Sequence, residues 1–282
     1  MSLQDDRPRV AIACQGGGSH TAFTAGVLGR LFADDVLSRY RVVGLSGTSG
    51  GAICAMLAWS ALIGNEPTKA GVLLREFWAN NAASSPPERM LNALTLWAGE
   101  FANYVATPAI SPYDSPVSDL AMAQLRALLD KSVDFRSFRV VTGDPDAPQL
   151  LLGAVDVVSG DFKAFDSRLG EITPEAVLAS AAIPNLFRSV HEAGGVYWDG
   201  LFSQNPPVRE LLDSQPDEIW VIQINAKKTD AEPRTVVEIA DRRNELSGNL
   251  SLYQELHFIE KIDTLLDEGE LAPGRYLSLI HI

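Results

Sequence analysis

The amino-acid sequence predicts an α/β fold with a mostly parallel central sheet. Residues 10–14 and 42–46 form short apolar runs with the length and composition of buried strands. Between these runs, residues 22–32 place apolar side chains at helical spacing. A strand, a helix and a second strand in this order make the unit that joins neighbouring parallel strands.

The region that follows is predicted to be helical. Residues 52–62 are almost wholly apolar, which predicts a helix that is buried on every side. Residues 71–129 show no strand-like alternation and are interrupted by prolines. We therefore predict a single domain over residues 1–282 with a helical, cap-like insertion at about 71–129.

Strand patterns return in the second half of the chain. Residues 151–155 and 162–165 flank a turn at 159–161, as expected of a hairpin. The same reasoning predicts further elements, which are a helix at 174–182, a strand at 218–224, a helix at 249–262 and a last strand at 275–280.

Composition and charge restrict the class of protein. The 282 residues are 46% hydrophobic and 21% charged, with a formal net charge of −13. Apolar runs stay shorter than the roughly 18 residues of a membrane span, and the first seven residues lack the features of a secretory signal. Because these signal features are missing, we expect a cytoplasmic protein. We expect no nucleic-acid partner, because an acidic surface repels nucleic acid and anionic headgroups. Any membrane contact is then transient and peripheral, through an exposed apolar patch; the oligomeric state is left open.

Cysteine and histidine positions indicate neither a disulfide framework nor a metal site. Cys14 and Cys54 are the only cysteines, and both lie in apolar stretches where buried thiols are expected. The four histidines are scattered without the spacing of a metal motif. We expect no metal and no cofactor.

Ser49 is the candidate nucleophile. Gly47, Ser49 and Gly51 fit the pattern G-x-S-x-G directly after a predicted strand and before a predicted helix. Glycines on both sides let the backbone reverse sharply, and the helix dipole favours negative charge at the serine. The alternative is a glycine-rich turn whose serine only caps the helix. Ser46 is a weaker candidate because its surroundings lack the second glycine.

A second glycine-rich segment follows the first predicted strand. Gly16, Gly17 and Gly18 precede the first helix, so their N–H groups are free to point at an anion. Acyl transfer needs such donors for the oxyanion that forms when a serine attacks an ester. A nucleotide phosphate loop is the competing interpretation, but neither of its common glycine patterns is met.

Asp199 is the candidate base. It stands beside Gly200 after a short predicted strand, and a carboxylate within hydrogen-bond reach of a serine accepts its proton directly. Taken alone, an Asp-Gly pair more often marks a turn.

The glycine loop, the serine elbow and the late Asp-Gly together resemble the patatin-like phospholipase family. The resemblance runs from residue 10 to about residue 224, and further agreement is found at 25–28, 179–184 and 205–208. It implies a three-layer α/β/α sandwich and hydrolysis of carboxylic esters in phospholipids or related acyl lipids.

The resemblance also implies the residue roles. Ser49 is then the nucleophile that forms an acyl-serine, and Asp199 is the general base of a dyad without histidine. The N–H groups of Gly16, Gly17 and Gly18 form the oxyanion hole. One departure is that His20 and Thr21 stand where the family usually carries a basic residue and a glycine. Because a neutral histidine holds an anion less firmly than a guanidinium, an acyl ester is a firmer expectation than a phospholipid.

Two other functions remain open from the sequence. A Ser-His-Asp esterase would use His257, which lies downstream of Asp199 in a predicted helix. A non-catalytic lipid-binding protein would keep the fold without the chemistry.

Residues 91–97, with Phe101 and Tyr104, form an apolar stripe that suits either a lid over acyl chains or ordinary core.

Overall fold

A central sheet organises the computed structural model, which describes residues 5–81, 111–184, 186–270 and 278–281. Its eight strands lie in the order β5-β6-β3-β2-β1-β7-β8, with β4 also paired to β3. The strands are β1 (Arg9–Cys14), β2 (Arg41–Thr48), β3 (Gln149–Asp156), β4 (Phe162–Asp166), β5 (Val190–Glu192), β6 (Gly195–Asp199), β7 (Glu218–Ile222) and β8 (Ser278–His281). Strands β1, β2, β3, β7 and β8 run parallel, which confirms the predicted sheet.

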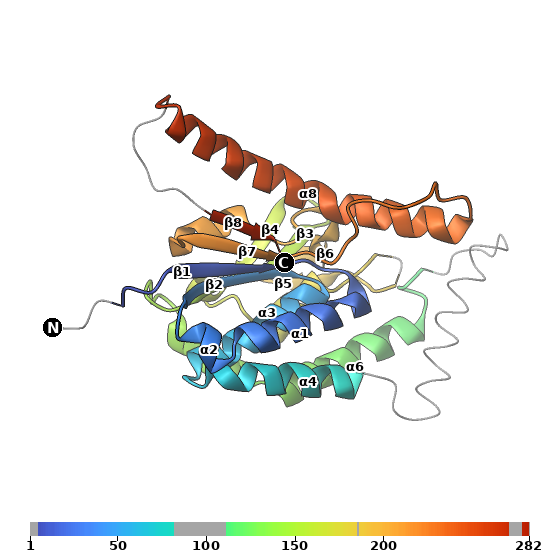
Figure 1. Cartoon of the computed structure of the whole chain (residues 1–282). Helices are drawn as coiled ribbons and strands as arrows, with labels where there is room; N and C mark the ends of the chain where they lie inside the picture. The colour runs from blue at the N-terminus through green and yellow to red at the C-terminus, as the bar shows by residue number, and fades with distance from the viewer. Residues whose placement is uncertain (1–4, 82–110, 185, 271–277, 282) are drawn as a thin grey trace.

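Helices cover both faces of this sheet (Figure 1). On one face lie α1 (Ala22–Leu31), α2 (Asp34–Leu37), α3 (Gly50–Ile63), α4 (Ala70–Asn81), α6 (Pro116–Ser132) and α7 (Pro174–Ser180). The other face is covered by α8 (Val236–Asp267). The three layers of the predicted α/β/α sandwich are therefore present.

The burial and pairing of the strands agree with their places in the sheet. The central strands β1, β2 and β3 are buried along almost their whole length, as expected of parallel strands covered on both faces. Strands β3 and β4 form the predicted hairpin, in which Leu152 lies opposite Phe165. Strand β6 pairs antiparallel with the far end of β3, so that Asp199 lies opposite Ala154.

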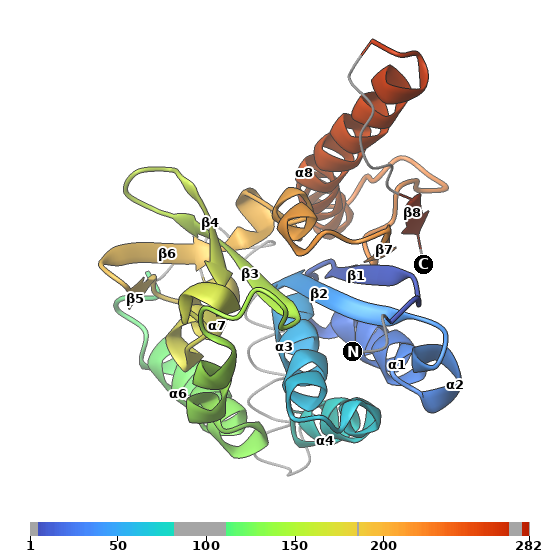
Figure 2. The ribbon, with the colours of Figure 1, turned by 90° about the vertical axis from the view of Figure 1, so that its left-hand side faces the viewer.

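Helix α3 forms the centre of the larger hydrophobic core. It is buried from Gly50 to Trp59, which confirms the prediction of a helix enclosed on every side. Helices α1, α4 and α7 contact it, and α7 also contacts β3 and β6 (Figure 2). The N-terminus of α3 is thereby held in the middle of the fold.

The described ends of the predicted cap-like insertion belong to the helical layer. Helix α4 packs against α1 and α3, and α6 packs against α4 and α7. Residues 82–110, which include the apolar stripe at 91–97 with Phe101 and Tyr104, lie outside the described residues. The cap and the lid therefore stay predictions.

Helix α8 is far longer than the segment 249–262 that periodicity predicts. Its start is defined by a capping box, in which the Thr235 side chain accepts from the Glu238 N–H and the Glu238 side chain accepts from the Thr235 N–H. Leu252, Leu256 and Ile259 pack onto the second face of the sheet. In the part of the chain that the structure describes, no helix is long and apolar enough to cross a membrane.

Candidate active site

Ser49 occupies a strained turn between β2 and α3. Its backbone angles are φ 57° and ψ −130°, in the left-handed half of conformational space that a residue with a side chain rarely adopts. A Cβ on Gly47 would run into the backbone of Gly51, and a Cβ on Gly51 would run into the carbonyl of Cys14. Both flanking glycines are needed because the turn brings backbone against backbone.

We expect Gly47→Ala to lower the free energy of unfolding by about 1–3 kcal/mol, since the added methyl group meets backbone that has no room to shift. Thermal unfolding followed by circular dichroism measures this change. Gly26→Ala is the matched control, because Gly26 lies exposed in α1 with open space at its Cβ position. Equal unfolding temperatures for the two variants would contradict the steric role of the elbow glycine.

The C-terminal end of α7 and the residues directly after it hold the turn at Ser49 in place. The Ser49 N–H donates to the Ser180 carbonyl at 3.0 Å and to the Ser180 hydroxyl at 3.1 Å. The same hydroxyl donates to the Gly153 carbonyl at 2.7 Å. Two residues on, the Ala182 carbonyl accepts from the Asp199 N–H at 3.0 Å. One short segment therefore holds both candidate catalytic residues.

Asp199 lies at the end of β6 and is completely buried. Its Oδ1 accepts from the Leu201 N–H at 2.8 Å. Its Oδ2 has no hydrogen-bond partner of standard geometry among the described residues. Burial raises the pKa of Asp199 from 3.8 to about 7, against the lowering effects of the Ser49 hydroxyl and the Leu201 N–H. A carboxylate with a free oxygen beside a serine hydroxyl, and with a pKa near neutrality, is suited to proton transfer.

The glycine loop lies directly against the elbow. A Cβ on Gly16 would come within 2.5 Å of the Thr48 carbonyl and 3.0 Å of the Ser49 Cβ. The Gly16 N–H, however, donates to Asn205 Oδ1 at 2.7 Å. The oxyanion hole stays a prediction. Of its three predicted donors, Gly16 has its N–H group paired with Asn205, whereas Gly17 is half-buried and Gly18 is exposed. No acceptor for these two N–H groups is found among the described residues.

Sequence comparison identifies the family of the chain. A family model described as patatin-like phospholipase matches residues 12–212, which include the glycine loop, Ser49 and Asp199. The chain belongs to the patatin-like phospholipase family. Membership of this family supports lipid acyl hydrolase activity in general.

Among solved structures, the chain is similar to VipD from Legionella pneumophila, with 12% sequence identity and a TM-score of 0.41. The match covers 93% of this chain and 56% of the VipD chain, so the chain spans little more than half the length of that protein. No curated protein matches the chain.

In this member of the patatin-like phospholipase family, no histidine of the described residues is a hydrogen-bond partner in the candidate site. His257 is exposed on α8, and His20 is exposed after the glycine loop. Within the described residues, no histidine forms a hydrogen bond with Ser49 or Asp199. Nor does any cluster of histidine, cysteine, aspartate and glutamate suited to a metal ion occur among these residues.

Sequence reasoning found no role for Ser180, Asn205 and Gln15, which the fold brings to the site. Ser180 and Asn205 lie in the segments 179–184 and 205–208, whose agreement with the family was visible without their contacts. Gln15 precedes the glycines and is completely buried. A buried amide or hydroxyl beside a glycine turn is a signal that such a side chain bonds to the turn's backbone.

Proposed function

We propose that this protein hydrolyses carboxylic esters of acyl lipids through a dyad of Ser49 and Asp199. The observation that supports the proposal most directly is the completely buried Asp199 carboxylate, whose Oδ2 has no standard partner and whose pKa is affected by the Ser49 hydroxyl. A buried carboxylate oxygen without a partner is costly to the fold, and such a cost is expected where the group serves a reaction.

In the proposed reaction, Asp199 takes the proton of the Ser49 hydroxyl while Ser49 Oγ attacks the ester carbonyl. The oxyanion receives hydrogen bonds from the N–H groups of Gly17 and Gly18, at the N-terminal side of α1, and the start of α3 adds its dipole. Asp199 then returns the proton to the leaving alcohol as the C–O bond breaks. Water next gives a proton to Asp199 and attacks the acyl-serine. As the bond between the acyl carbon and Ser49 Oγ breaks, Asp199 returns this proton to Ser49 Oγ, which releases the acid and restores both residues.

The proposed substrate is an acyl lipid, with phospholipids as the first class to test. His20 is exposed beside the glycine loop, where the resemblance to the family leads us to expect a basic residue. The ester rather than the headgroup is therefore the feature that we propose the site recognises.

Covalent labelling tests whether the fold carries the chemistry. We expect a fluorophosphonate probe to label the wild type at Ser49, identified by peptide mass spectrometry, because the probe reacts much faster with an activated serine than with an ordinary one. Asp199→Asn should slow the labelling strongly, since the base is lost. An unlabelled wild type would favour the non-catalytic lipid-binding alternative, and labelling that depends on His257 would favour the triad.

The pH dependence follows from the raised pKa of Asp199. The carboxylate must be ionised to accept the serine proton, so kcat/KM should rise about tenfold per pH unit below 7 and become constant above it. Hydrolysis of p-nitrophenyl butyrate between pH 5 and pH 9 measures this profile, after the rate with Ser49→Ala has been subtracted. A profile that is flat from pH 5 to pH 8 would argue against Asp199 as the base.

A further inference from the structure

Two asparagines hold the peptide groups of Gly16. Asn205 accepts from the Gly16 N–H through Oδ1 at 2.7 Å, and its Nδ2 lies 3.4 Å from the Gly16 carbonyl and 3.3 Å from the Gly248 carbonyl. The Nδ2 of Asn225 also donates to the Gly16 carbonyl, at 3.4 Å. Asn205 is completely buried. Both polar groups of Gly16 are thus used for holding the loop rather than for binding a ligand.

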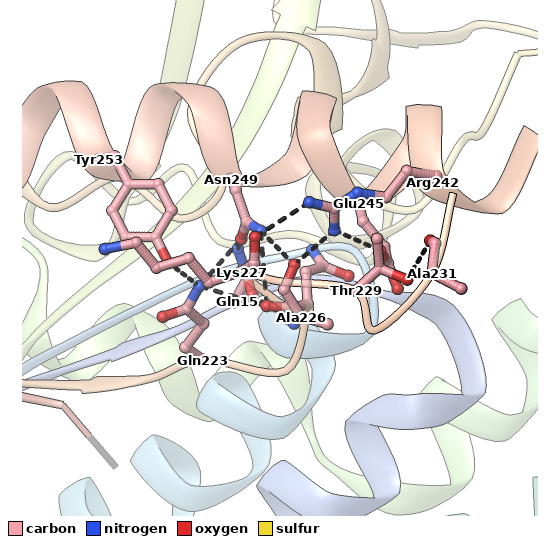
Figure 3. A network of polar contacts seen from close by, with 11 residues as sticks. Gln15, Gln223, Ala226, Lys227, Thr229, Ala231, Arg242, Glu245, Asn249 and Tyr253 are labelled. Carbon is pink, nitrogen blue, oxygen red and sulfur yellow. Dashed lines mark hydrogen bonds and ion pairs between the residues drawn. The ribbon is translucent and has the colours of Figure 1, made fainter. Parts of the chain in front are cut away.

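Gln15 anchors the residue before Gly16. Its Oε1 accepts from the N–H groups of Ile224 and Asn225, and its Nε2 donates to the Gly248 carbonyl and to Asn249 Oδ1. Asn249 in turn accepts from Gln223 (Figure 3). The first half of the glycine loop is therefore tied to the chain after β7 and to α8. Its second half, Gly17 and Gly18, makes no such bonds among the described residues.

The anchored position of Gly16 affects the geometry of the two glycines that follow it. Gly16 has no free space toward Ser49, because an added Cβ would come within 3.0 Å of the Ser49 Cβ. The position of Gly16 therefore sets where the next two N–H groups lie relative to the serine. Donors that stabilise an oxyanion act strongly only when they are held in place before the reaction.

We propose that Asn205 is a positioning residue of the oxyanion hole, which pairs with both polar groups of Gly16 so that Gly17 and Gly18 face the oxyanion. This role rests on the proposed hydrolase function. Asn205 does not touch the substrate in this arrangement. It acts through the loop, and the loop contact spans 189 positions of sequence, so it exists only in the folded chain.

The test compares Asn205→Ala with Gln149→Ala. Both side chains are buried amides. Gln149, however, lies at the start of β3, where it donates a hydrogen bond to Asp166, and among the described residues it has no hydrogen bond to the glycine loop. Asn205→Asp is the conservative variant, because it keeps an oxygen that accepts from the Gly16 N–H. Thermal unfolding of each protein identifies any variant that fails to fold, in which case Asn205→Asp carries the comparison.

We expect Asn205→Ala to lower kcat for p-nitrophenyl butyrate by about 10- to 100-fold with little change in KM, since the lost contacts act on the transition state. Asn205→Asp should retain more activity than Asn205→Ala. An alkyl trifluoromethyl ketone adds to the serine as an oxyanion, so its affinity should fall by the same factor as kcat/KM. Equal kcat and equal inhibitor affinity in Asn205→Ala and Gln149→Ala would overturn the proposal.

Hydrogen–deuterium exchange separates this proposal from the proposed function. Peptides that cover Gln15 to Ser19 should exchange faster in Asn205→Ala than in the wild type, whereas Gln149→Ala should leave them unchanged. If Asn205→Ala exchanges faster but the wild type is neither active nor labelled, the proposed hydrolase function is refuted while the role of Asn205 in holding the loop stands. Unchanged exchange would refute the positioning role even in an active enzyme.

Discussion

Ser49→Ala and Asp199→Asn are each expected to lower kcat/KM for p-nitrophenyl esters at least about a thousandfold. The first change removes the atom that forms the acyl-enzyme, and the second removes the base that takes its proton. Because the two residues act as one unit, the double variant should be about as slow as either single variant. Initial rates with acetyl to palmitoyl esters measure the loss across chain lengths.

Two controls make this result specific. Ser46→Ala removes a buried hydroxyl in β2 that has no hydrogen-bond partner among the described residues, so activity and stability should change little. His257→Ala removes an exposed imidazole on α8 and should leave turnover unchanged. Loss of activity in His257→Ala, with activity kept in Asp199→Asn, would replace the dyad by a histidine-dependent mechanism.

Asp199→Asn is also expected to make the protein more stable at alkaline pH. In the folded protein burial raises the pKa of Asp199 to about 7, whereas its ordinary value is 3.8. The folded state therefore binds the proton more tightly than the unfolded state. The stability that this proton contributes is complete below pH 3.8 and is lost as the pH rises to about 7. Above pH 7 the wild type holds a buried charge, at a cost of up to ~4 kcal/mol.

Asparagine is neutral at every pH and keeps an oxygen for the Leu201 N–H. The difference in unfolding free energy between Asp199→Asn and the wild type should therefore grow from near zero at pH 4 to its maximum above pH 7. Urea unfolding at pH 4, 6 and 8 measures it. Asp156→Asn is the control, because Asp156 is only half-buried and N–H groups of Ser159 and Val158 lower its pKa. If Asp156→Asn and Asp199→Asn gained the same unfolding free energy, burial of Asp199 would not be the cause of the effect.

These two expectations describe one property of the site. The same carboxylate that the reaction needs in its ionised form is the one that the fold holds at a cost. Loss of activity together with a gain in stability is the signature of a group kept for function. A purely structural aspartate would show the opposite change in stability, because its replacement would remove a favourable contact.

The sequence by itself determined the main strands, the buried helix and the turn that carries the serine. These features depend on local patterns: uninterrupted apolar runs for β1 and β2, an apolar segment of helical length for α3, and glycines at 47 and 51 where backbone meets backbone. Such patterns are readable because the physical constraint acts between neighbours in the chain. The cysteines likewise are buried and unpaired, as their apolar surroundings predict.

Only the tertiary structure decided how the site is completed. The buried state of Asp199 and its raised pKa arise from elements that pack around β6. The Ser49 N–H finds Ser180 across 131 positions of sequence, and the Gly16 N–H finds Asn205 across 189. That last contact pairs the N–H group of Gly16, which is one of the three donors that the sequence predicts for an oxyanion. Composition and periodicity carry no information on such pairs, because desolvation and long-range hydrogen bonds depend on which distant segments meet when the chain folds.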